Sequence, residues 1–228
     1  IPLRIQSMPQ STGRITVSGG NVFTADKVSS ICCGGSSANF PGRGILVQDS
    51  DAPVEIIGNT IIATDGDTTP NEGINGIDVS NSNVDLIDGV TFNDVEGNAV
   101  AVLDGGGGSE ITTVRSTFGM ADAGGGALFV EPNSTVGDVT NNDLSTSSGS
   151  GSSLISNGTG SPLNLSGNWW GTTTASDVET AAGSGNDFSP FLRTSTDTDG
   201  LTGFQGDFSE LGVTTLGQAI GTFGANQR

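Results

Sequence analysis

The sequence lacks the side chains that enzymes use most often to move protons near neutral pH. Histidine and tyrosine are absent, and Lys27 is the only lysine beside six arginines. General-base catalysis near pH 7 usually relies on histidine, or on tyrosine or lysine in other designs. Any catalysis by this chain would therefore have to use carboxylates, arginine or Lys27, which lies in the excursion after Ala25.

Positive charge is also scarce. Seven Lys and Arg residues stand against 25 Asp and Glu residues, which gives a formal net charge of −18. This balance argues against nucleic acid and anionic membranes as partners, and it favours solubility and the attraction of divalent cations. A solvated acidic surface with no further role is the simpler interpretation. The chain has no run of about 18 apolar residues, so no membrane span is expected.

Cysteine is limited to the adjacent pair Cys32 and Cys33. A disulfide between neighbours is strained, so the pair forms a rare vicinal ring, two bridges to other chains, or two thiols. The chain begins with Ile1 rather than Met, and no signal peptide is visible, which fits a processed mature protein or a fragment of a longer one.

What the chain does have is a repeat. Units that end at Phe118, Leu144 and Trp170 close alike, at an even spacing of 26 residues, and earlier units close at Ile61 and Phe92, with a longer gap between those two. Each unit opens with a small residue and then alternates apolar groups, which is typical of a strand. The expected opening strands are 44–47, 76–79, 99–102, 127–130 and 153–156. A second strand is expected in each unit at 54–57, 84–87, 110–114, 136–139 and 162–165.

Units of this length cannot bury their own apolar face, so they must stack on one another. A propeller blade needs about 40–45 residues, whereas a unit of about 26 holds three short strands and three turns. The sequence therefore predicts an all-β parallel β-helix, a solenoid of about six coils over residues 1–192, with excursions at 25–44 and 64–75. A linker and an apolar C-terminal tail are expected at 193–228.

The closing segment carries a resemblance to a known family. Gly167-Asn-Trp-Trp-Gly171, followed by Asp187-Phe-Ser-Pro-Phe-Leu192, is similar to the closing motif of many secreted bacterial β-helix repeat proteins. Residues 14 to 192 resemble the right-handed parallel β-helix superfamily that includes pectate-lyase-like proteins. The resemblance implies a right-handed solenoid that is secreted or displayed at the cell surface. One departure is Thr172-Thr-Thr-Ala175, where the family often carries Gly-Pro.

That superfamily includes polysaccharide lyases, hydrolases and epimerases, so the outward-facing residues were searched for a catalytic cluster. The outward column of the opening strands reads Leu46, Asp78, Ala101, Phe129 and Ile155, which leaves Asp78 without a charged neighbour above or below. A glycosidase carboxylate pair needs two groups about 5–10 Å apart. The remaining weak candidates, Asp85, Asp88 and Arg115, form no obvious cluster in sequence.

Two acidic loops are candidate calcium sites, because oxygen-rich glycine-containing loops suit a hard cation. Neither loop completes the spacing of an EF-hand, and acidic turns without metal are commoner. No other cofactor is indicated. The candidate ligands are Asp65, Asp67 and Glu72 in the first loop and Asp197, Asp199 and Asp207 in the second.

Apolar residues gather at both termini, where they could cap the same chain or complete the stack of a neighbour in a head-to-tail polymer. They are Ile1, Leu3 and Ile5 at one end and Phe204, Phe208, Leu211, Leu216, Ile220 and Phe223 at the other. The only tryptophans, Trp169 and Trp170, are expected to cover the end of the core.

A column of residues before the unit endings also recurs: Thr60, Thr91 and Thr117, then Asp143 and Trp169. Three threonines in register would make a hydroxyl ladder that docks a glycan or a regular lattice, or simply a solvent-facing surface, which is the favoured interpretation.

These observations predict a non-catalytic extracellular β-helix with a structural, adhesive or self-assembly role. Its partners would be further copies of itself, another surface protein or an extracellular polysaccharide. One alternative is a carbohydrate-active enzyme of the polysaccharide lyase or hydrolase kind, and another is a calcium-stabilised glycan-binding module. Fold alone does not decide among them.

Overall fold

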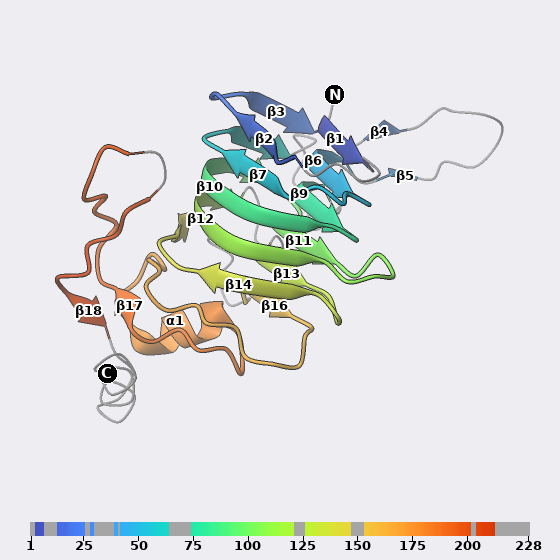
Figure 1. Ribbon diagram of the computed structural model, residues 1–228. Coiled ribbons are helices and arrows are strands. Elements are labelled where there is room, and N and C mark those ends of the chain that lie inside the picture. Colours follow the sequence, from blue (N-terminus) through green and yellow to red (C-terminus); the bar gives the residue numbers. More distant parts are fainter. Residues whose placement is uncertain are drawn as a thin grey trace.

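The computed structural model describes residues 3–6, 13–25, 28–29, 39–40, 42–63, 74–120, 126–146, 153–201 and 204–212. Within these ranges the chain is mostly β-strand, and its two main sheets are parallel. The sheets lie on either side of a common core, and one helix lies at the C-terminal end of the stack (Figure 1).

The first sheet, sheet A, contains the predicted opening strands, stacked in chain order with every pair parallel. The predicted strands are confirmed to within two residues at each end. In order, the strands are β1 (Leu3–Gln6), β6 (Arg43–Gln48), β9 (Asn75–Ser80), β11 (Val100–Leu103), β13 (Leu128–Val130) and β16 (Ile155–Asn157).

The second sheet, sheet B, contains the later strands of each unit, again in parallel pairs. Its first row is β2 (Ile15–Ser18), β7 (Val54–Ile57), β10 (Asn83–Val95), β12 (Glu110–Met120) and β14 (Thr135–Val139). The distal parts of β10 and β12 form a second row with β3 (Val22–Ala25), β8 (Thr60–Ala63) and β15 (Asp143–Thr146). Each complete unit therefore contributes one strand position to sheet A and two to sheet B.

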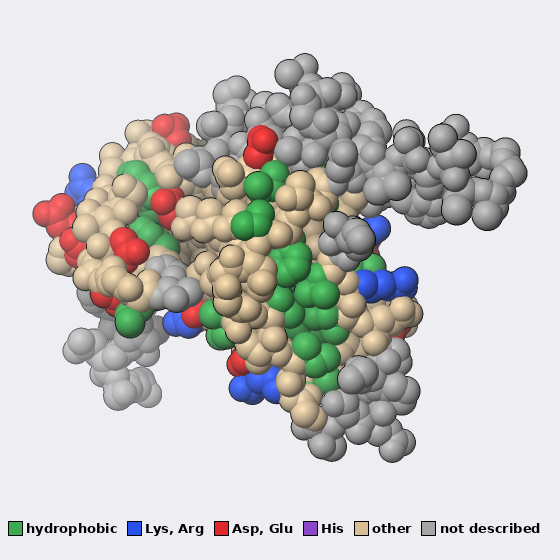
Figure 2. Space-filling view, turned by 90° about the horizontal axis from the view of Figure 1, so that it is seen from above, with side chains coloured by type: hydrophobic (Ala, Val, Ile, Leu, Met, Phe, Trp, Pro, Cys, Tyr) green, Lys and Arg blue, Asp and Glu red, His purple; other side chains and the backbone are tan. Residues whose placement is uncertain are grey.

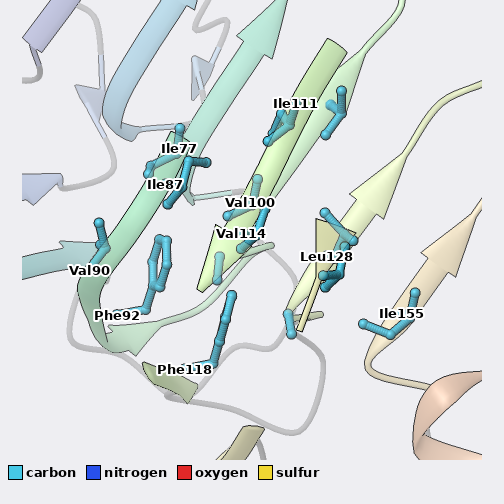
Figure 3. Close-up of a cluster of buried hydrophobic side chains, with 14 of the residues drawn as sticks. Ile77, Ile87, Val90, Phe92, Val100, Ile111, Val114, Phe118, Leu128 and Ile155 are labelled. Atoms are coloured by element: carbon cyan, nitrogen blue, oxygen red, sulfur yellow. The ribbon is translucent and has the colours of Figure 1, made fainter. Parts of the chain in front are cut away.

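Alternating side chains fill the space between the sheets. Ile77 and Val100 from sheet A meet Ile87 and Ile111 from sheet B in one continuous cluster (Figure 3). Because the period of a strand is two residues, the apolar positions of the repeat all turn to this side. The rings of Phe92 and Phe118, at equivalent positions of successive units, stack with centroids 4.9 Å apart and planes inclined by 16°.

Two sequence-based assignments of strands are wrong. Ile155 pairs with Leu128 and is buried, so Ser156, not Ile155, continues the outward column beyond Phe129. The predicted strand 162–165 is reduced to a bridge between Asn164 and Asp187. Pro162 has no N–H to donate, and the amide of Leu165 donates to Asp187 instead of pairing with β14.

The predicted excursions fall between strands. β3 ends at Ala25 and β6 begins at Arg43, and between them β4 (Val28–Ser29) and β5 (Asn39–Phe40) pair antiparallel. β8 ends at Ala63 and β9 begins at Asn75. Residues 64–73 lie outside the described ranges, as do Cys32 and Cys33.

The C-terminal end of the stack is covered by a helix that the sequence analysis did not predict. Helix α1 (Ala175–Ala182) buries Val178 and Ala182, and Asp177 lies in its acidic first turn. Trp170 lies inside the core cluster and Trp169 is half-buried, so the helix covers the end that the tryptophans were expected to cover alone. β17 (Phe191–Leu192) and β18 (Leu211–Gly212) then pair antiparallel beyond it.

Buried asparagine side chains bond units to one another at several corners of the stack, namely at Asn59, Asn142 and Asn168. Asn142 is fully buried, donates to the carbonyls of Val114 and Thr140, and accepts from the amide of Ser116 at 2.7 Å. Asn168, 26 residues later, accepts from the amide of Asn142 at 2.9 Å. Because buried backbone groups need partners, this asparagine ladder satisfies groups that the strands leave unpaired at a corner.

Candidate functional site

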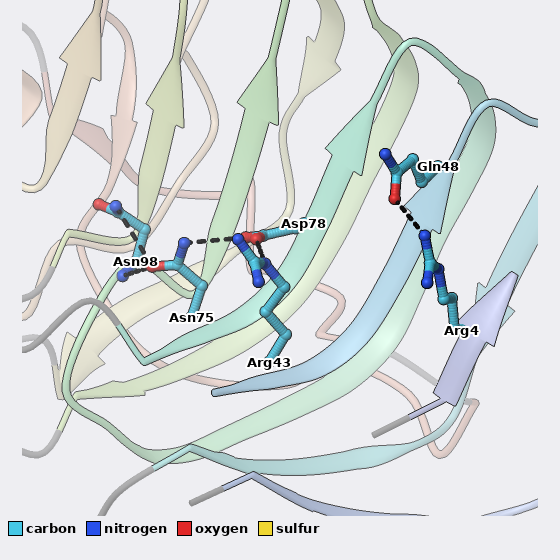
Figure 4. A network of polar contacts seen from close by, with 6 residues as sticks. All are labelled: Arg4, Arg43, Gln48, Asn75, Asp78 and Asn98. Atoms are coloured by element: carbon cyan, nitrogen blue, oxygen red, sulfur yellow. Dashed lines mark hydrogen bonds and ion pairs between the residues drawn. The ribbon is translucent and has the colours of Figure 1, made fainter. Parts of the chain in front are cut away.

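Asp78 in β9 lies on the outward side of sheet A, yet its carboxylate is fully buried. In register it lies between Leu46 and Ala101, as predicted. The expectation of no charged neighbour is nevertheless wrong, because Arg43, from the beginning of β6, donates from Nε to Oδ2 of Asp78 (Figure 4).

A second polar side chain completes the surroundings of this carboxylate. Asn75 donates from Nδ2 to Oδ1 of Asp78 at 2.8 Å, and its own Oδ1 accepts from the backbone amide of Asn98. Both carboxylate oxygens are thus engaged, one by Arg43 and one by Asn75. The contacts join three successive units, since Arg43 lies in β6, Asn75 and Asp78 lie in β9, and Asn98 lies in the turn before β11.

Burial raises the pKa of Asp78 above its ordinary value of 3.8, and the opposing effects of Arg43 and Asn75 do not cancel this desolvation. A buried carboxyl with a raised pKa is a feature of general acids. Such an acid must also reach a substrate, however, and the side chain of Asp78 is 0 % exposed. The arrangement therefore fits a contact between units better than a proton donor.

We expect Asp78→Asn to change the pH dependence of stability. Because the pKa of Asp78 is raised in the folded state, ionisation of Asp78 costs stability as pH rises from about 3.8 through the folded value. The free energy of unfolding of the wild type, relative to that of Asp78→Asn, should therefore fall across this window and stay level above it. Urea denaturation of both proteins from about pH 3 to pH 7 measures the difference; a relative gain by the wild type with rising pH would contradict the assignment.

The other weak catalytic candidates lie on the outward side of sheet B, and the structure pairs them with arginines. Arg115 in β12 lies 2.9 Å from Asp88 in β10, at the same register position. Arg14 lies 3.0 Å from Asp85 and also 3.0 Å from Glu55. Sequence reasoning found no cluster because Arg14 lies far from its partners in sequence and its side chain crosses two units.

These ion pairs resemble that of Asp78 and Arg43, since each links neighbouring units of the stack. The side chain of Asp88 is 14 % exposed and that of Arg14 is 55 % exposed, so the pairs range from nearly buried to open. Exposed pairs contribute only about 0–1 kcal/mol each. Their consistent effect is to fix the register between units and to neutralise acids that would otherwise repel one another.

The threonine column is in register, as predicted. Thr91 lies opposite Thr60 on one side and Thr117 on the other, and the column continues through Asp143 to Trp169. Thr91 is exposed and Thr60 and Thr117 are half-buried. Three hydroxyls in line make a short polar strip, and its docking to a glycan stays a prediction.

One open hollow lies at the corner between β14 and the segment that follows β16. It has a volume of about 370 Å³ and is lined by Asn133, Ser134, Thr135, Val136, Thr159, Ser161, Pro162 and Leu163. The lining contains no acidic or basic side chain. The hollow therefore does not bring an acid and a base together.

The acids of the second proposed calcium loop accept hydrogen bonds from nearby backbone amides. Asp197 accepts from Asp199 and Gln205, and Asp207 accepts from Ser209. The side-chain and backbone hydrogen bonds of Ser209 lower the pKa of Asp207. Within the described ranges, no three acidic side chains meet in a group that could hold a metal ion. Asp65, Asp67 and Glu72 lie outside those ranges, so calcium stays a prediction.

The apolar terminal residues that the structure describes contact their own chain. Leu3 and Ile5 lie in β1, which pairs with β6, and Leu211 lies in β18, which pairs with β17. Phe204 is buried, whereas Phe208 is 50 % exposed. Ile1, Leu216, Ile220 and Phe223 lie outside the described ranges.

Comparison with known proteins gave no match to a family model, to a curated protein or to a solved structure. Among the described residues, no helix is long and apolar enough to cross a membrane.

Proposed function

We propose that this chain is a right-handed parallel β-helix of the pectate-lyase-like architecture that acts without catalysis, as a structural or adhesive element outside the cell or on its surface. The parallel registers of both sheets, with strands stacked in chain order, support the architecture. Right-handed connection between parallel strands of one sheet is the general rule, which supports the handedness.

One observation carries the non-catalytic part of the proposal. Each acidic catalytic candidate, Asp78, Asp85 and Asp88, is engaged by an arginine from another unit of the stack. A carboxylate that is engaged in such an ion pair between units serves to hold the stack together rather than to act as a catalytic acid or base. Histidine and tyrosine, which often act as bases near pH 7, are absent from the chain.

A polysaccharide lyase or hydrolase remains the alternative, and Asp78 is the residue that favours it. Its raised pKa beside Arg43 would suit acid–base chemistry if a substrate could reach it. A calcium-stabilised glycan-binding module has only the sequence of the acidic loops to support it.

The test is incubation of the purified chain with pectins, alginates and related glycans, with unsaturated products and new reducing ends as the readouts. We expect no product above the level of a buffer blank. Turnover by the wild type that Asp78→Asn abolishes, in a variant whose circular dichroism is unchanged, would establish the enzymatic alternative. Arg4→Gln serves as the matched control, because Arg4 lies on the same sheet and donates to Gln48 rather than to a carboxylate candidate (Figure 4).

A further inference from the structure

The two ends of the stack differ in how they are covered. β1, β2 and β3 are the first strands of their rows, so each has one edge without a partner strand among the described residues. Apolar side chains of these strands are only partly buried against the core, namely Leu3, Ile15, Val17 and Phe23. Figure 2 looks onto this end, and apolar side chains gather there in the middle of the visible surface.

Acidic residues are also distributed unevenly between the two ends of the chain. Residues 1–25 contain no Asp or Glu, so all 25 acidic residues of the chain lie between 26 and 228. The cations of this stretch, Arg4 and Arg14, bond to side chains of the following units, Arg4 to Gln48 and Arg14 to Glu55 and Asp85. Copies of a chain with net charge −18 repel one another over most of their surface. Because the first unit contains no acidic residue, two copies that meet through their N-terminal ends do not bring acids of their first units against each other.

Helix α1, at the opposite end, has a polar outer side. Helix α1 turns Val178 and Ala182 inward, while Asp177, Glu179 and Thr180 are exposed on its outer side. A polar, acidic helix surface cannot bury Ile15 or Val17 of another copy. At that end the amide of Leu154, directly before β16, donates to the carbonyl of Ala181, so the helix backbone contacts the start of the last strand of sheet A.

We propose that the N-terminal end face, defined by Leu3, Ile15, Val17, Phe23 and the free edges of β1 to β3, is a dimer interface at which two copies of this chain pack end to end, N-terminus against N-terminus. A two-fold axis makes such a surface self-complementary. Apolar side chains meet apolar side chains, and the free edges pair antiparallel across the axis. Free edges of this kind invite strand pairing unless they are protected.

This inference rests on the proposed structural role and specifies its form of assembly. Because the helix covers the other end, assembly stops at two copies, in contrast to the head-to-tail polymer that the apolar termini suggest. The dimer carries twice the net charge of the monomer, and salt screens repulsion between exposed charges. Raising the salt concentration should therefore tighten the dimer.

Sedimentation velocity of the full chain under reducing conditions tests the proposal over a range of protein and salt concentrations. We expect a monomer–dimer equilibrium that shifts toward dimer with salt. Val17→Asp should weaken the dimer by at least about 10-fold, since it buries a charge in the interface. Thr180→Asp is the matched control: Thr180 has nearly the shape of valine but is exposed on helix α1 at the opposite end of the stack, and we expect no change.

Hydrogen exchange of the wild type decides the question if Val17→Asp fails to fold. Amides of β1, β2 and β3 should gain protection as the protein concentration rises, whereas those of β14, at the opposite end of sheet B, should not. A monomer under all conditions, filaments longer than two copies, or equal weakening by Thr180→Asp would overturn the proposal. These outcomes leave the glycan assays unchanged, so failure of the dimer and failure of the proposed function are distinguishable.

Discussion

Phe118→Ala should lower the free energy of unfolding by about 3–5 kcal/mol, the usual cost of removing a buried phenylalanine side chain. The ring of Phe118 is 2 % exposed and stacks on that of Phe92 in the preceding unit. Removing it leaves a cavity in the middle of the stack, where strands on both sides hold the backbone in place. Urea denaturation followed by circular dichroism measures the loss.

Phe208→Ala is the matched control, because the same side chain is 50 % exposed there, and we expect a loss below about 1 kcal/mol. A double-mutant cycle between Phe92→Ala and Phe118→Ala should also give a coupling energy of about 1 kcal/mol for the stacked pair. If Phe118→Ala costs no more than Phe208→Ala, the ring does not lie in the core and the register of the second row is wrong.

Asn142→Asp should destabilise the fold by about 3 kcal/mol at neutral pH, although the two side chains have the same shape. The aspartate keeps the oxygen that accepts from Ser116, but it cannot donate to the carbonyls of Val114 and Thr140. It also places a carboxylate at a site that is 0 % exposed, where the charged form is costly. Much of the loss should therefore be recovered at a pH low enough to protonate the new carboxyl.

Asn164→Asp provides the comparison for this substitution, because Asn164 is exposed and its oxygen accepts locally from Ser166. We expect a change below about 1 kcal/mol. Equal effects of the two substitutions would show that the asparagine ladder does not hold the units together.

The repeat could be recognised from the sequence because similar short segments recur along the chain. Phe92, Phe118 and Leu144 occupy equivalent buried positions. In the sequence they are unit endings that follow one another at a spacing of 26 residues. The same endings begin with Asn59, Ser116 and Asn142, so the asparagine ladder could have been inferred from them. Whether these amides turn inward depends on how the corner is formed, which composition alone does not determine.

Helix α1 was missed although its sequence carries helix signals. Ala175, Val178 and Ala182 are spaced as one helical face, and Gly183 follows as a C-cap at φ 79°. The alternation of apolar residues in the repeat predicts strands, and the eight residues of α1 are too few to give a strong helical pattern. The misassigned Ile155 has a similar origin, because a shift of one residue exchanges the two faces of a strand.

The ion pairs of Asp78 with Arg43 and of Asp85 with Arg14 were beyond sequence reasoning for a different reason, whereas Asp88 and Arg115 share one register position. Comparing residues at one register position tests only direct neighbours, and Asp78 has Leu46 and Ala101 there. Arg43 is in register with Asn75 and reaches Asp78 through a long side chain. Contacts of this kind depend on side-chain length and direction, which only coordinates provide.

The central claim is that successive units lie parallel and in register, so that residues about 26 apart are neighbours. Nuclear Overhauser effects in the labelled protein test it most directly. We predict contacts from the amide of Ser116 to Asn142 and from Phe92 to Phe118, together with the evenly spaced pattern of parallel strands. Short contacts between the α-protons of neighbouring strands within sheet A or sheet B, as in antiparallel pairs, would contradict the account.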